Sequence, residues 1–368
     1  MSRIVAVEIM PCIMPKEDPK WAFALAANPL SEGWIVGLRT DNGVTGYGYG
    51  SATPHMGATF DGLKAMLDTF RPLLEKRDPF DLEPILMALD RKVRGSFQAK
   101  AAVDCALHDL QARLLGLPLN KLLGGTVRED VPILRILALK KPAEMAANAK
   151  KLVVQGYNYL KIKVHGDVAE DVACVKAIRK MVGPSVHLTI DANQSYTPKN
   201  AIRALNIMAE YNVELAEQPV RIDDLRGLKL VTDSVPITVE ADESANSLEE
   251  VVHLVNERIV DAVSLKIPKL GGLRNTIAAA RICEAGAIKY RLGAAVGSSL
   301  LAAHGMHLAA ALSGVDYACE LGEHERLLND PFEGFEIVKG RAKLPKGIGT
   351  GMRLAKRAKG KASLAAAE

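Results

Sequence analysis

The stretch Tyr159-Leu-Lys-Ile-Lys-Val164 has the composition of a buried β-strand, yet it carries two lysines. Side chains two residues apart point to the same face of a strand, so Lys161 and Lys163 lie side by side while the apolar residues face the other way. Taken alone, such a pair is more typical of a solvent-facing edge, because neighbouring ammonium groups repel and burial penalises each charge. The rest of the chain favours an inner strand instead.

From about residue 130 onward, short apolar runs alternate with amphipathic segments, which is the pattern of βα units in a parallel sheet. The alternation covers about 190 residues and favours an α/β fold of the (β/α) barrel type over a doubly wound open sheet. Because such barrels usually contain about 250 residues, we expect short loops. The expected strands are Val131–Ala138, Tyr159–Val164, His187–Asp191, Glu214–Glu217, Ile237–Asp242, Asp261–Ile267, Ile288–Ala294 and Asp316–Glu320. The expected helices are Pro142–Gln155, Val168–Val182, Thr197–Tyr211, Ser247–Val255, Asn275–Gly286 and Ser299–Leu312.

Residues 1–125 lack this alternation and predict a separate α+β module. Its last strand is rich in glycine, which indicates close backbone approach or a bulge, and Asn42-Gly43 predicts a hairpin turn with positive φ. After Gly322 the alternation stops. We therefore predict a barrel over residues 126–321 and a C-terminal segment, 322–368, that returns to the N-terminal module. Strands are expected at Ile4–Pro11, Gly33–Arg39 and Gly46–Tyr49, and helices at Ala58–Leu74, Pro84–Lys92 (with Pro84 first) and Lys100–Leu115.

The net charge of +4 comes from the end of the chain. Residues 352–368 contain five basic residues and one acidic residue, so the remainder is neutral and no nucleic-acid partner is expected. The basic tail is predicted to be solvated and partly disordered. Five cysteines without a Cys-x-x-Cys pair indicate a reducing compartment. The sequence shows no signal peptide or membrane-spanning run, so we expect a cytoplasmic protein with no membrane partner.

Acidic residues stand at the ends of three consecutive expected strands, between strands that carry lysines. These ends are Asp191-Ala-Asn193, Glu217-Gln-Pro219 and Glu240-Ala-Asp242-Glu243, and the next strand contains Lys266. Each acid alone is better explained as a helix N-cap or a salt-bridge partner. Strand ends converge in a barrel, however, and three carboxylates that meet there repel unless a cation binds. Oxygen ligands suit Mg²⁺ best, with Mn²⁺ as an alternative, and disfavour Zn²⁺.

The order Lys-x-Lys, Asp-x-Asn, Glu-Gln-Pro, Asp-Glu and Lys-x-x-Lys-x-Gly-Gly resembles the enolase superfamily, in particular its muconate-lactonizing-enzyme-like subgroup within the mandelate racemase/muconate lactonizing enzyme family. The resemblance extends to Asp41–Gly50 and Ala102–Gly125, which are similar to its capping domain. It implies a (β/α)7β modified TIM barrel with an α+β capping domain built from both chain ends. It further implies Mg²⁺ held by Asp191, Glu217 and Asp242. By position, Lys163 matches the family base, Lys161 its helper, and Lys266 the base on the opposite face.

The implied chemistry is removal of the proton α to a carboxylate, which produces a doubly charged enediolate that Mg²⁺ stabilises. Burial, Mg²⁺ and Lys161 push the pKa of Lys163 down, while nearby carboxylates oppose them. Lysines on opposite faces fit a racemase or epimerase acting on an amino acid, N-substituted amino acid or dipeptide. A lactonizing cycloisomerase and a dehydratase or syn-elimination enzyme use the same intermediate. A catalytically inactive barrel relative is the non-enzyme alternative. A small carboxylate substrate and a homo-oligomer are the expected partners.

Further site residues are expected around this centre. Gly297 stands where the subgroup commonly carries a glutamate, so we expect Gly297 and Ser298 to line the substrate region or to bind an anion at the start of the following helix. Asn193, Glu240 and Glu243 are expected beside the metal ligands, with Glu240 also an alternative ligand. Lys269 is interpreted as a helix-side lysine or one beside the ligands. Loops 16–30 and 51–58 of the capping domain are expected to set specificity, with Trp21, Phe23 and His55 as candidates.

Overall fold

The computed structural model describes residues 2–293 and 295–355. Its centre is a parallel sheet of seven strands in the order β13-β12-β11-β10-β9-β8-β7, so strands that are consecutive along the barrel sequence are also neighbours in space. The opening stretch forms β8 and is an inner strand, as predicted. The strands are β7 (Leu134–Leu137), β8 (Tyr159–Lys163), β9 (His187–Asp191), β10 (Val213–Glu217), β11 (Thr238–Ala241), β12 (Ala262–Leu265) and β13 (Lys289–Leu292).

Residues 315–320 close the barrel between β13 and β7. The Asp316 and Glu320 amides donate to carbonyl groups of β13, and the Leu134 amide of β7 donates to the Cys319 carbonyl. Strand Asp316–Glu320 was predicted, but these contacts are isolated bridges rather than a ladder. The predicted strand Val131–Ala138 is also divided, because β6 (Asp130–Pro132) leaves the barrel and pairs with β16 (Arg341–Lys343). The backbone thus has seven βα units followed by an eighth barrel position.

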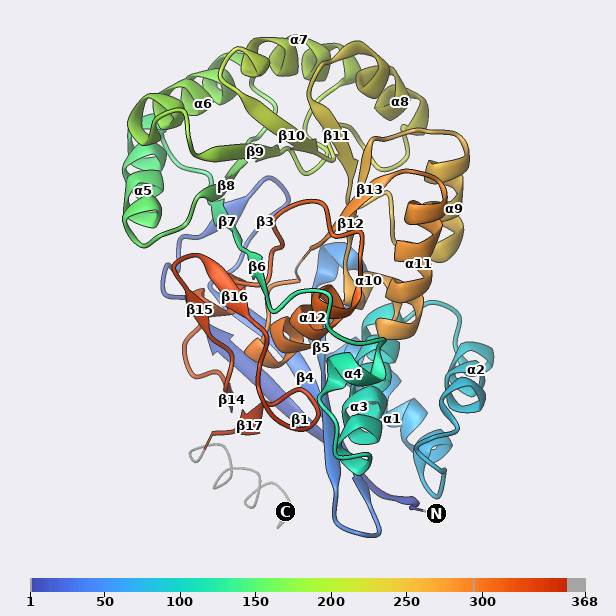
Figure 1. Cartoon of the computed structure of the whole chain (residues 1–368). Helices are drawn as coiled ribbons and strands as arrows, with labels where there is room; N and C mark the ends of the chain where they lie inside the picture. Colours follow the sequence, from blue (N-terminus) through green and yellow to red (C-terminus); the bar gives the residue numbers. More distant parts are fainter. Residues whose placement is uncertain (1, 294, 356–368) are drawn as a thin grey trace.

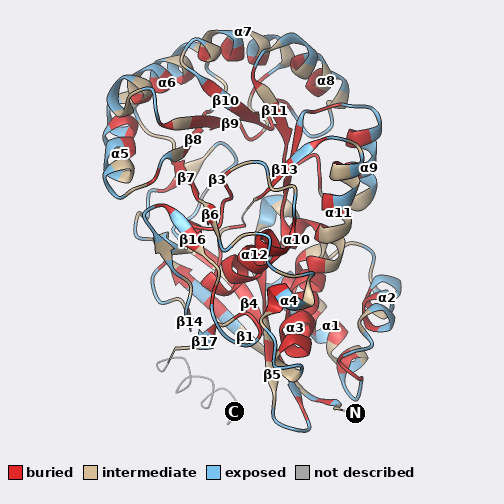
Figure 2. Cartoon of the chain, in the orientation of Figure 1, coloured by how far each residue is buried: buried red, intermediate tan, exposed pale blue. Residues whose placement is uncertain are grey.

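Helices cover the outside of the sheet, as Figure 1 shows. In Figure 2 their inner faces are buried and their outer faces exposed, which is the pattern expected of amphipathic helices on a parallel sheet. Helix α8 was not among the helices expected from the sequence. The outer helices are α5 (Pro142–Val154), α6 (Val168–Val182), α7 (Pro198–Ala209), α8 (Leu225–Ser234), α9 (Leu248–Asn256) and α11 (Leu273–Ala285). These features confirm the predicted (β/α)7β fold class.

The N-terminal module contains the antiparallel sheet β1-β4-β5 and three helices. A Cβ at Gly48 would lie 2.0 Å from the Ala102 carbonyl oxygen, so the predicted close backbone approach is confirmed: β5 lies directly on α3. At the hairpin turn, positive φ occurs at Gly43 but not at Asn42. Pro84 is the third residue of its helix, not the first. The elements are β1 (Ile4–Pro15), β4 (Leu30–Thr40), β5 (Thr45–Ala52), α1 (Phe60–Leu74), α2 (Leu82–Lys92) and α3 (Phe97–Leu114).

Helices α3 and α12 (Ser299–Ala311) lie between the module and the barrel and are buried on nearly all sides (Figure 2). The polar residues of α3 are buried as well as its apolar ones. Asp104 and Asp109 show why this is tolerated, because backbone amides of other segments donate hydrogen bonds to both carboxylates. Asp104 accepts from the Leu273 amide (2.6 Å), and Asp109 accepts from the amides of Tyr47 (2.9 Å) and Thr350 (2.7 Å).

The C-terminal segment contacts both parts of the molecule. The Leu328 amide donates to the Pro15 carbonyl at the end of β1, and the Glu17 amide donates to the Arg326 carbonyl. Residues 356–368, which hold most of the predicted basic tail, lie outside the described residues. Among the described helices, none has the length and apolar character needed to cross a membrane. The segment's remaining elements are η2 (Glu323–Arg326), β14 (Phe332–Glu333), β15 (Ile337–Val338) and β17 (Arg353–Leu354).

Candidate active site

Strand register brings the charged residues of the opening stretch and its neighbours to one level of the barrel. Lys163 is paired with Asp191, Asp191 with Glu217, and Glu217 with Glu240. All four side chains are buried. Asp242 follows two residues after Glu240, at the carboxyl end of its strand, where barrel sites form. The predicted convergence of charges from adjacent strands is therefore present.

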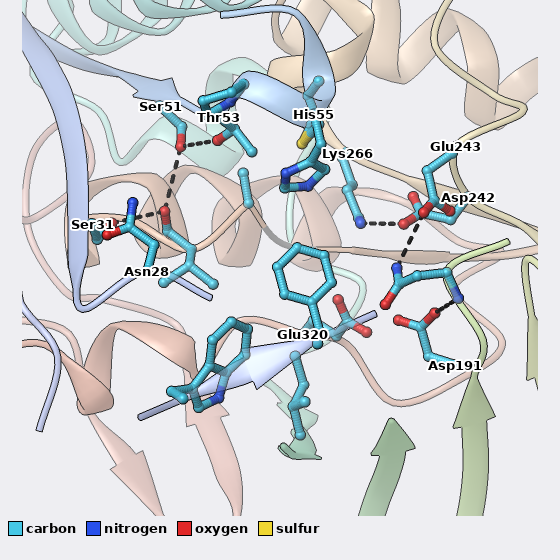
Figure 3. Close-up of a pocket in the computed structure, with 18 of the residues that line it drawn as sticks. Asn28, Ser31, Ser51, Thr53, His55, Asp191, Asp242, Glu243, Lys266 and Glu320 are labelled. Carbon is cyan, nitrogen blue, oxygen red and sulfur yellow. Dashed lines mark hydrogen bonds and ion pairs between the residues drawn. The ribbon is translucent and has the colours of Figure 1, made fainter. Parts of the chain in front are cut away.

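A cavity of about 140 Å³ opens at this end of the barrel, between the barrel and the N-terminal module. Figure 3 shows its lining, with strand-end carboxylates on one side and residues of the module on the other. Barrel residues that line it include Lys161, Lys163, Asp191, Asn193, Asp242, Glu243, Lys266, Lys269 and Glu320. Residues of the module that line it include Lys16, Trp21, Phe23, Asn28, Ser31, Glu32, Ser51, Thr53 and His55.

Lys161 and Lys163 point to the same face of β8 and share the Asp191 carboxylate. Their Nζ atoms lie 3.0 Å and 2.5 Å from Asp191 Oδ2. Lys161 also contacts Glu217 Oε2 (2.8 Å) and Glu320. Burial alone would lower the pKa of Lys161, but the three carboxylates outweigh burial and raise its pKa well above the usual value. Lys161 is therefore a cation that holds carboxylates in place.

Lys163 has fewer partners. Besides Asp191 it donates to Asn193 Oδ1 (2.7 Å), and its Nζ lies 5.0 Å from the centre of the Phe23 ring. It lines the cavity together with Phe23. This position matches that of a group which contacts substrate.

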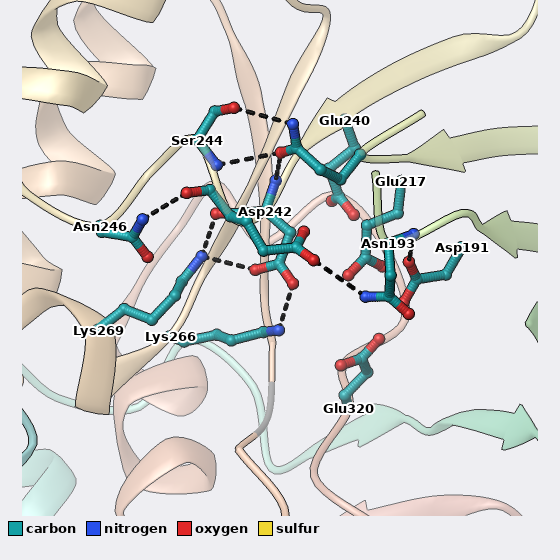
Figure 4. A network of polar contacts seen from close by, with 12 residues as sticks. Asp191, Asn193, Glu217, Glu240, Asp242, Ser244, Asn246, Lys266, Lys269 and Glu320 are labelled. Carbon is teal, nitrogen blue, oxygen red and sulfur yellow. Dashed lines mark hydrogen bonds and ion pairs between the residues drawn. The ribbon is translucent and has the colours of Figure 1, made fainter. Parts of the chain in front are cut away.

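Lys266 and Lys269 both bind Asp242, as Figure 4 shows. Lys266 Nζ lies 2.5 Å from Asp242 Oδ2, and Lys269 Nζ lies 2.5 Å from Oδ1. Lys269 is the third residue of the short helix α10 (Ile267–Leu270), which begins immediately after Lys266. This helical turn brings Lys269 back onto the carboxylate that Lys266 contacts.

Lys163 and Lys266 come from opposite sides of the barrel. With residues 315–320 as the eighth position, β8 is second and β12 is sixth in order from β7. Four positions separate the two strands in either direction, so they face each other across the barrel. Both lysines line the same cavity. A planar group bound between them would present one face to each lysine.

The three expected metal ligands are buried, and lysines contact each of them. Within the described part of the chain, no group of three or more His, Cys, Asp or Glu side chains is arranged so that it could hold a metal ion. The donor set nevertheless fits one in its chemistry. Glu217 Oε1 is buried without a hydrogen-bond partner, and burial together with Asp191 raises the pKa of Glu217 well above its usual value. A cation bound there would give this oxygen a partner and favour the ionised carboxylate.

The charge balance of the buried cluster is a second reason to expect a bound cation. The buried cluster has one negative charge more than it has positive charges when all groups are ionised. Bound Mg²⁺ and a substrate carboxylate together add one positive charge and would neutralise it. The cluster consists of Asp191, Glu217, Glu240, Asp242, Glu243 and Glu320 with Lys161, Lys163, Lys266, Lys269 and Arg291.

The module contributes an aromatic wall to the cavity. The Trp21 and Phe23 rings lie 5.6 Å apart, and Phe23 packs edge-on against His55 at 5.2 Å. Partial burial lowers the pKa of His55 to about 4, and the ammonium group of Lys266 adds to this effect. His55 is therefore neutral at neutral pH. These three residues line the cavity where the sequence placed them.

Gly297 and Ser298 do not line the main cavity, and their expected role in substrate binding stays a prediction. They line a separate, smaller hollow beside α12, and a Cβ at Gly297 would lie 2.4 Å from the Tyr49 ring. Ser298 Oγ donates to Asp330 (2.8 Å), and the Ser299 amide donates to the same carboxylate (2.6 Å). Asp330 therefore already occupies the start of α12, where an anion was expected. Ala295 and Val296 line the main cavity instead.

The structure adds Arg291 and Glu320 to the predicted set. Arg291 is fully buried and takes Glu240 as a partner, so Glu240 lies in an ion pair rather than among the expected ligands. Glu320 stands at the end of the eighth predicted strand, as the other acids stand at the ends of theirs. This position could have identified it from the sequence. Arg291 stands within Lys-Tyr-Arg-Leu, which has no local feature that points to a site.

The chain is similar to known protein families and solved structures along most of its length. Residues 18–124 match the model of the mandelate racemase / muconate lactonizing enzyme N-terminal domain, and residues 144–358 match the enolase C-terminal domain-like model. A dipeptide epimerase of Enterococcus faecalis, solved with Mg and the dipeptide L-Leu-L-Tyr, has 32% identity and a TM-score of 0.92 over 95% of this chain and 99% of that chain. An N-succinyl-L-Arg/Lys racemase of Bacillus cereus is 30% identical over 83% of this chain and 84% of its own length. A chloromuconate cycloisomerase of Cupriavidus necator is 33% identical over 88% of this chain and 87% of its own.

Proposed function

The chain belongs to the mandelate racemase / muconate lactonizing enzyme family, and we propose that it is a racemase or epimerase of an amino acid, an N-substituted amino acid or a dipeptide. The observation that carries this proposal is the position of Lys163 and Lys266 on opposite sides of one cavity. A base on each face of a planar enediolate can remove the proton on one side and return it on the other, which inverts the carbon.

Each charged residue then has a role. Lys163 and Lys266 exchange the proton with the α-carbon of the substrate, which lies between them. Lys161 keeps Asp191 and Glu217 in position through the ion pair that it makes with each of them. Asp191, Glu217 and Asp242 would hold Mg²⁺, which supplies electrophilic stabilisation of the substrate carboxylate when bound. Mn²⁺ is an alternative ion, and the homo-oligomer stays a prediction that sedimentation velocity would test.

Proton exchange in deuterium oxide tests the role of the two lysines. The wild-type enzyme should incorporate deuterium at the α-carbon of both stereoisomers. Lys163→Ala and Lys266→Ala should each lose about 10²- to 10⁴-fold in stereoinversion, because one face lacks its base. Each variant should still exchange the proton of one stereoisomer, and the two variants should differ in which one.

Lys176→Ala is the control, because Lys176 is exposed on α6 and far from the cavity lining. It should exchange and invert like the wild type. Inversion by both site variants at the wild-type rate, or turnover of a substrate without α-exchange, would refute the proposal.

The substrate itself requires a panel of compounds. The aromatic wall of Trp21, Phe23 and His55 favours an apolar group near the α-carbon, and Lys16, Asn28 and Glu32 provide polar contacts farther into the module. Dipeptides, N-acyl amino acids and muconates should be compared by exchange and product analysis. Turnover of a muconate with no exchange of any amino acid derivative would favour the second candidate function, a cycloisomerase, which the chloromuconate relative supports.

A further inference from the structure

Arg291 on β13 joins three carboxylates inside the barrel. Its Nε lies 3.0 Å from both oxygens of Glu240, and its Nη2 lies 2.7 Å from Glu240 Oε2. The same Nη2 lies 2.5 Å from Glu217 Oε2, and Nη1 lies 2.9 Å from Glu320 Oε1. The side chain is 0% exposed, so these contacts fully determine its position.

These contacts make the two oxygens of Glu217 unequal. Oε2 accepts from Arg291 and from Lys161 (2.8 Å). Oε1 is buried and, among the described residues, has no hydrogen-bond partner. A cation that binds this carboxylate would therefore find Oε2 already occupied by two positively charged donors. Oε1 is the oxygen that is available to it.

This asymmetry matters for the choice of ion. Ca²⁺ takes six to eight oxygen ligands at about 2.3–2.6 Å and readily binds both oxygens of one carboxylate. Mg²⁺ requires near-octahedral geometry at about 2.0–2.1 Å, which the narrow angle between two oxygens of one carboxylate distorts. Mg²⁺ therefore loses little when a ligand offers a single oxygen, whereas Ca²⁺ loses a contact.

We propose that Arg291 is a positioning residue that restricts Glu217 to binding through one oxygen and thereby selects Mg²⁺ over Ca²⁺. The inference rests on the proposed function, in which Glu217 is a metal ligand. Glu240 has the complementary role of neutralising Arg291 and fixing its orientation through the paired contacts of its carboxylate. The Arg291–Glu240 pair adds no net charge to the site, so its effect is one of geometry.

The test replaces this pair as a unit. Arg291→Met alone leaves Glu240 buried without a counterion, whereas Arg291→Met/Glu240→Met exchanges a buried ion pair for apolar side chains, a change that proteins often tolerate. Titration calorimetry of the full chain with MgCl₂ and with CaCl₂, without substrate, gives both affinities. We expect the wild type to prefer Mg²⁺ and the double variant to shift the ratio of affinities at least 10-fold toward Ca²⁺.

Arg135→Met/Glu323→Met is the matched control, because this pair is also buried and ionic (3.2 Å) but contacts none of the proposed ligands. The ratio of Mg²⁺ to Ca²⁺ affinity of this control variant should equal that of the wild type. Arg291→Lys provides the same test if the double variant does not fold. Its single ammonium group keeps a counterion for Glu240 but cannot bind both carboxylates in the fork geometry of arginine. It should shift the ratio in the same direction.

Two results would overturn the inference alone. One is a Mg²⁺-to-Ca²⁺ ratio that is unchanged in a folded Arg291 variant while Mg²⁺ still binds. The other is loss of both ions by a folded variant, because Arg291 would then be required for binding rather than for selection. Absence of Mg²⁺ binding by the wild type would instead overturn the metal site of the proposed function, and the inference with it.

Discussion

At the scale of single residues, the site depends on cations and carboxylates that share partners. Two lysines bind Asp191 and two bind Asp242, so each of these carboxylates has two cationic partners. The strand ends themselves are shaped by Asn193, two residues after Asp191, and Gln218, directly after Glu217, which both adopt positive φ. Gln218 accepts hydrogen bonds from the amides of Asp242 and Ser244 (both 3.0 Å) and so connects adjacent strand ends.

Asn193 is predicted to control the position of Lys163. Its Oδ1 accepts from Lys163 Nζ (2.7 Å), and its Nδ2 donates to Glu243 (3.1 Å). Asn193→Ala should lower kcat by about 10- to 100-fold with little change in KM, because the lysine loses the group that orients it. Steady-state kinetics on the substrate found by the panel measures both constants. Asn206→Ala, at an exposed asparagine of α7 that binds only its own helix, is the control. A loss confined to KM would contradict the prediction.

At the scale of elements, α12 is a helix without charged residues that lies buried between the module and the barrel. All of its 13 residues are buried, and its two histidines bind neighbouring segments. His307 Nδ1 accepts from the Asn120 amide (3.2 Å), so Nε2 carries the proton and donates to the Thr350 carbonyl (3.1 Å). His307 is thus held by hydrogen bonds to neighbouring segments on both ring nitrogens.

His307 should make stability depend on pH. Burial lowers its pKa to about 4, and His304 adds to this while the Thr350 hydrogen bond opposes it. The unfolded chain binds a proton below about pH 6.5, whereas the folded chain does not until about pH 4, so stability is lost as the pH falls between these values. His307→Gln should remove about 2 kcal/mol of this loss at pH 5, measured by urea unfolding at pH 7 and 5.

The protonation state of the His307 ring can also be measured directly. Nitrogen-15 NMR of histidine-labelled protein should show the Nε2–H form of His307 without titration between pH 5 and 8. His307→Gln assigns the signal by its disappearance. A midpoint near 6.5 would mean that the ring is solvated and would exclude the stability effect.

At the scale of the whole molecule, one cavity depends on two parts of the chain. The barrel provides the charges and the N-terminal module provides the aromatic wall, and the hydrogen bond from the Leu273 amide to Asp104 connects the two. The site therefore forms only when the module is seated on the barrel. Ligand binding and global stability should be linked for this reason.

Mg²⁺ is predicted to stabilise the folded chain, because only the folded state brings Asp191, Glu217 and Asp242 together. At a concentration 100 times Kd the gain is about 2.7 kcal/mol. Urea unfolding with excess Mg²⁺ or with EDTA should show this difference in the wild type and not in Glu217→Gln. Glu214→Gln is the control on the same strand, because Glu214 is exposed and pairs with His187. Equal stability of the wild type in both buffers would contradict the metal site.

The sequence by itself determined the fold class, the inner strand with its lysine pair and the carboxylates at the following strand ends. These features are local: a strand alternates with period two, a βα unit has a characteristic length, and a charge at the end of such a strand needs no distant residue to be recognised. The Trp21, Phe23 and His55 wall was also predicted, because loops between strands of a capping domain are natural positions for cavity residues.

Only the tertiary structure decided which charges meet. Arg291 contacts Glu240 and Glu217 across the inside of a closed barrel, and neither the sequence separation nor any periodicity encodes that distance. The surroundings of Gly297 were likewise decided by the tertiary structure, since Tyr49 from the N-terminal module packs against it. Lys269 reaches Asp242 because a single helical turn follows Lys266. Local patterns place a residue on an element, but barrel closure and docking of the module determine its partners.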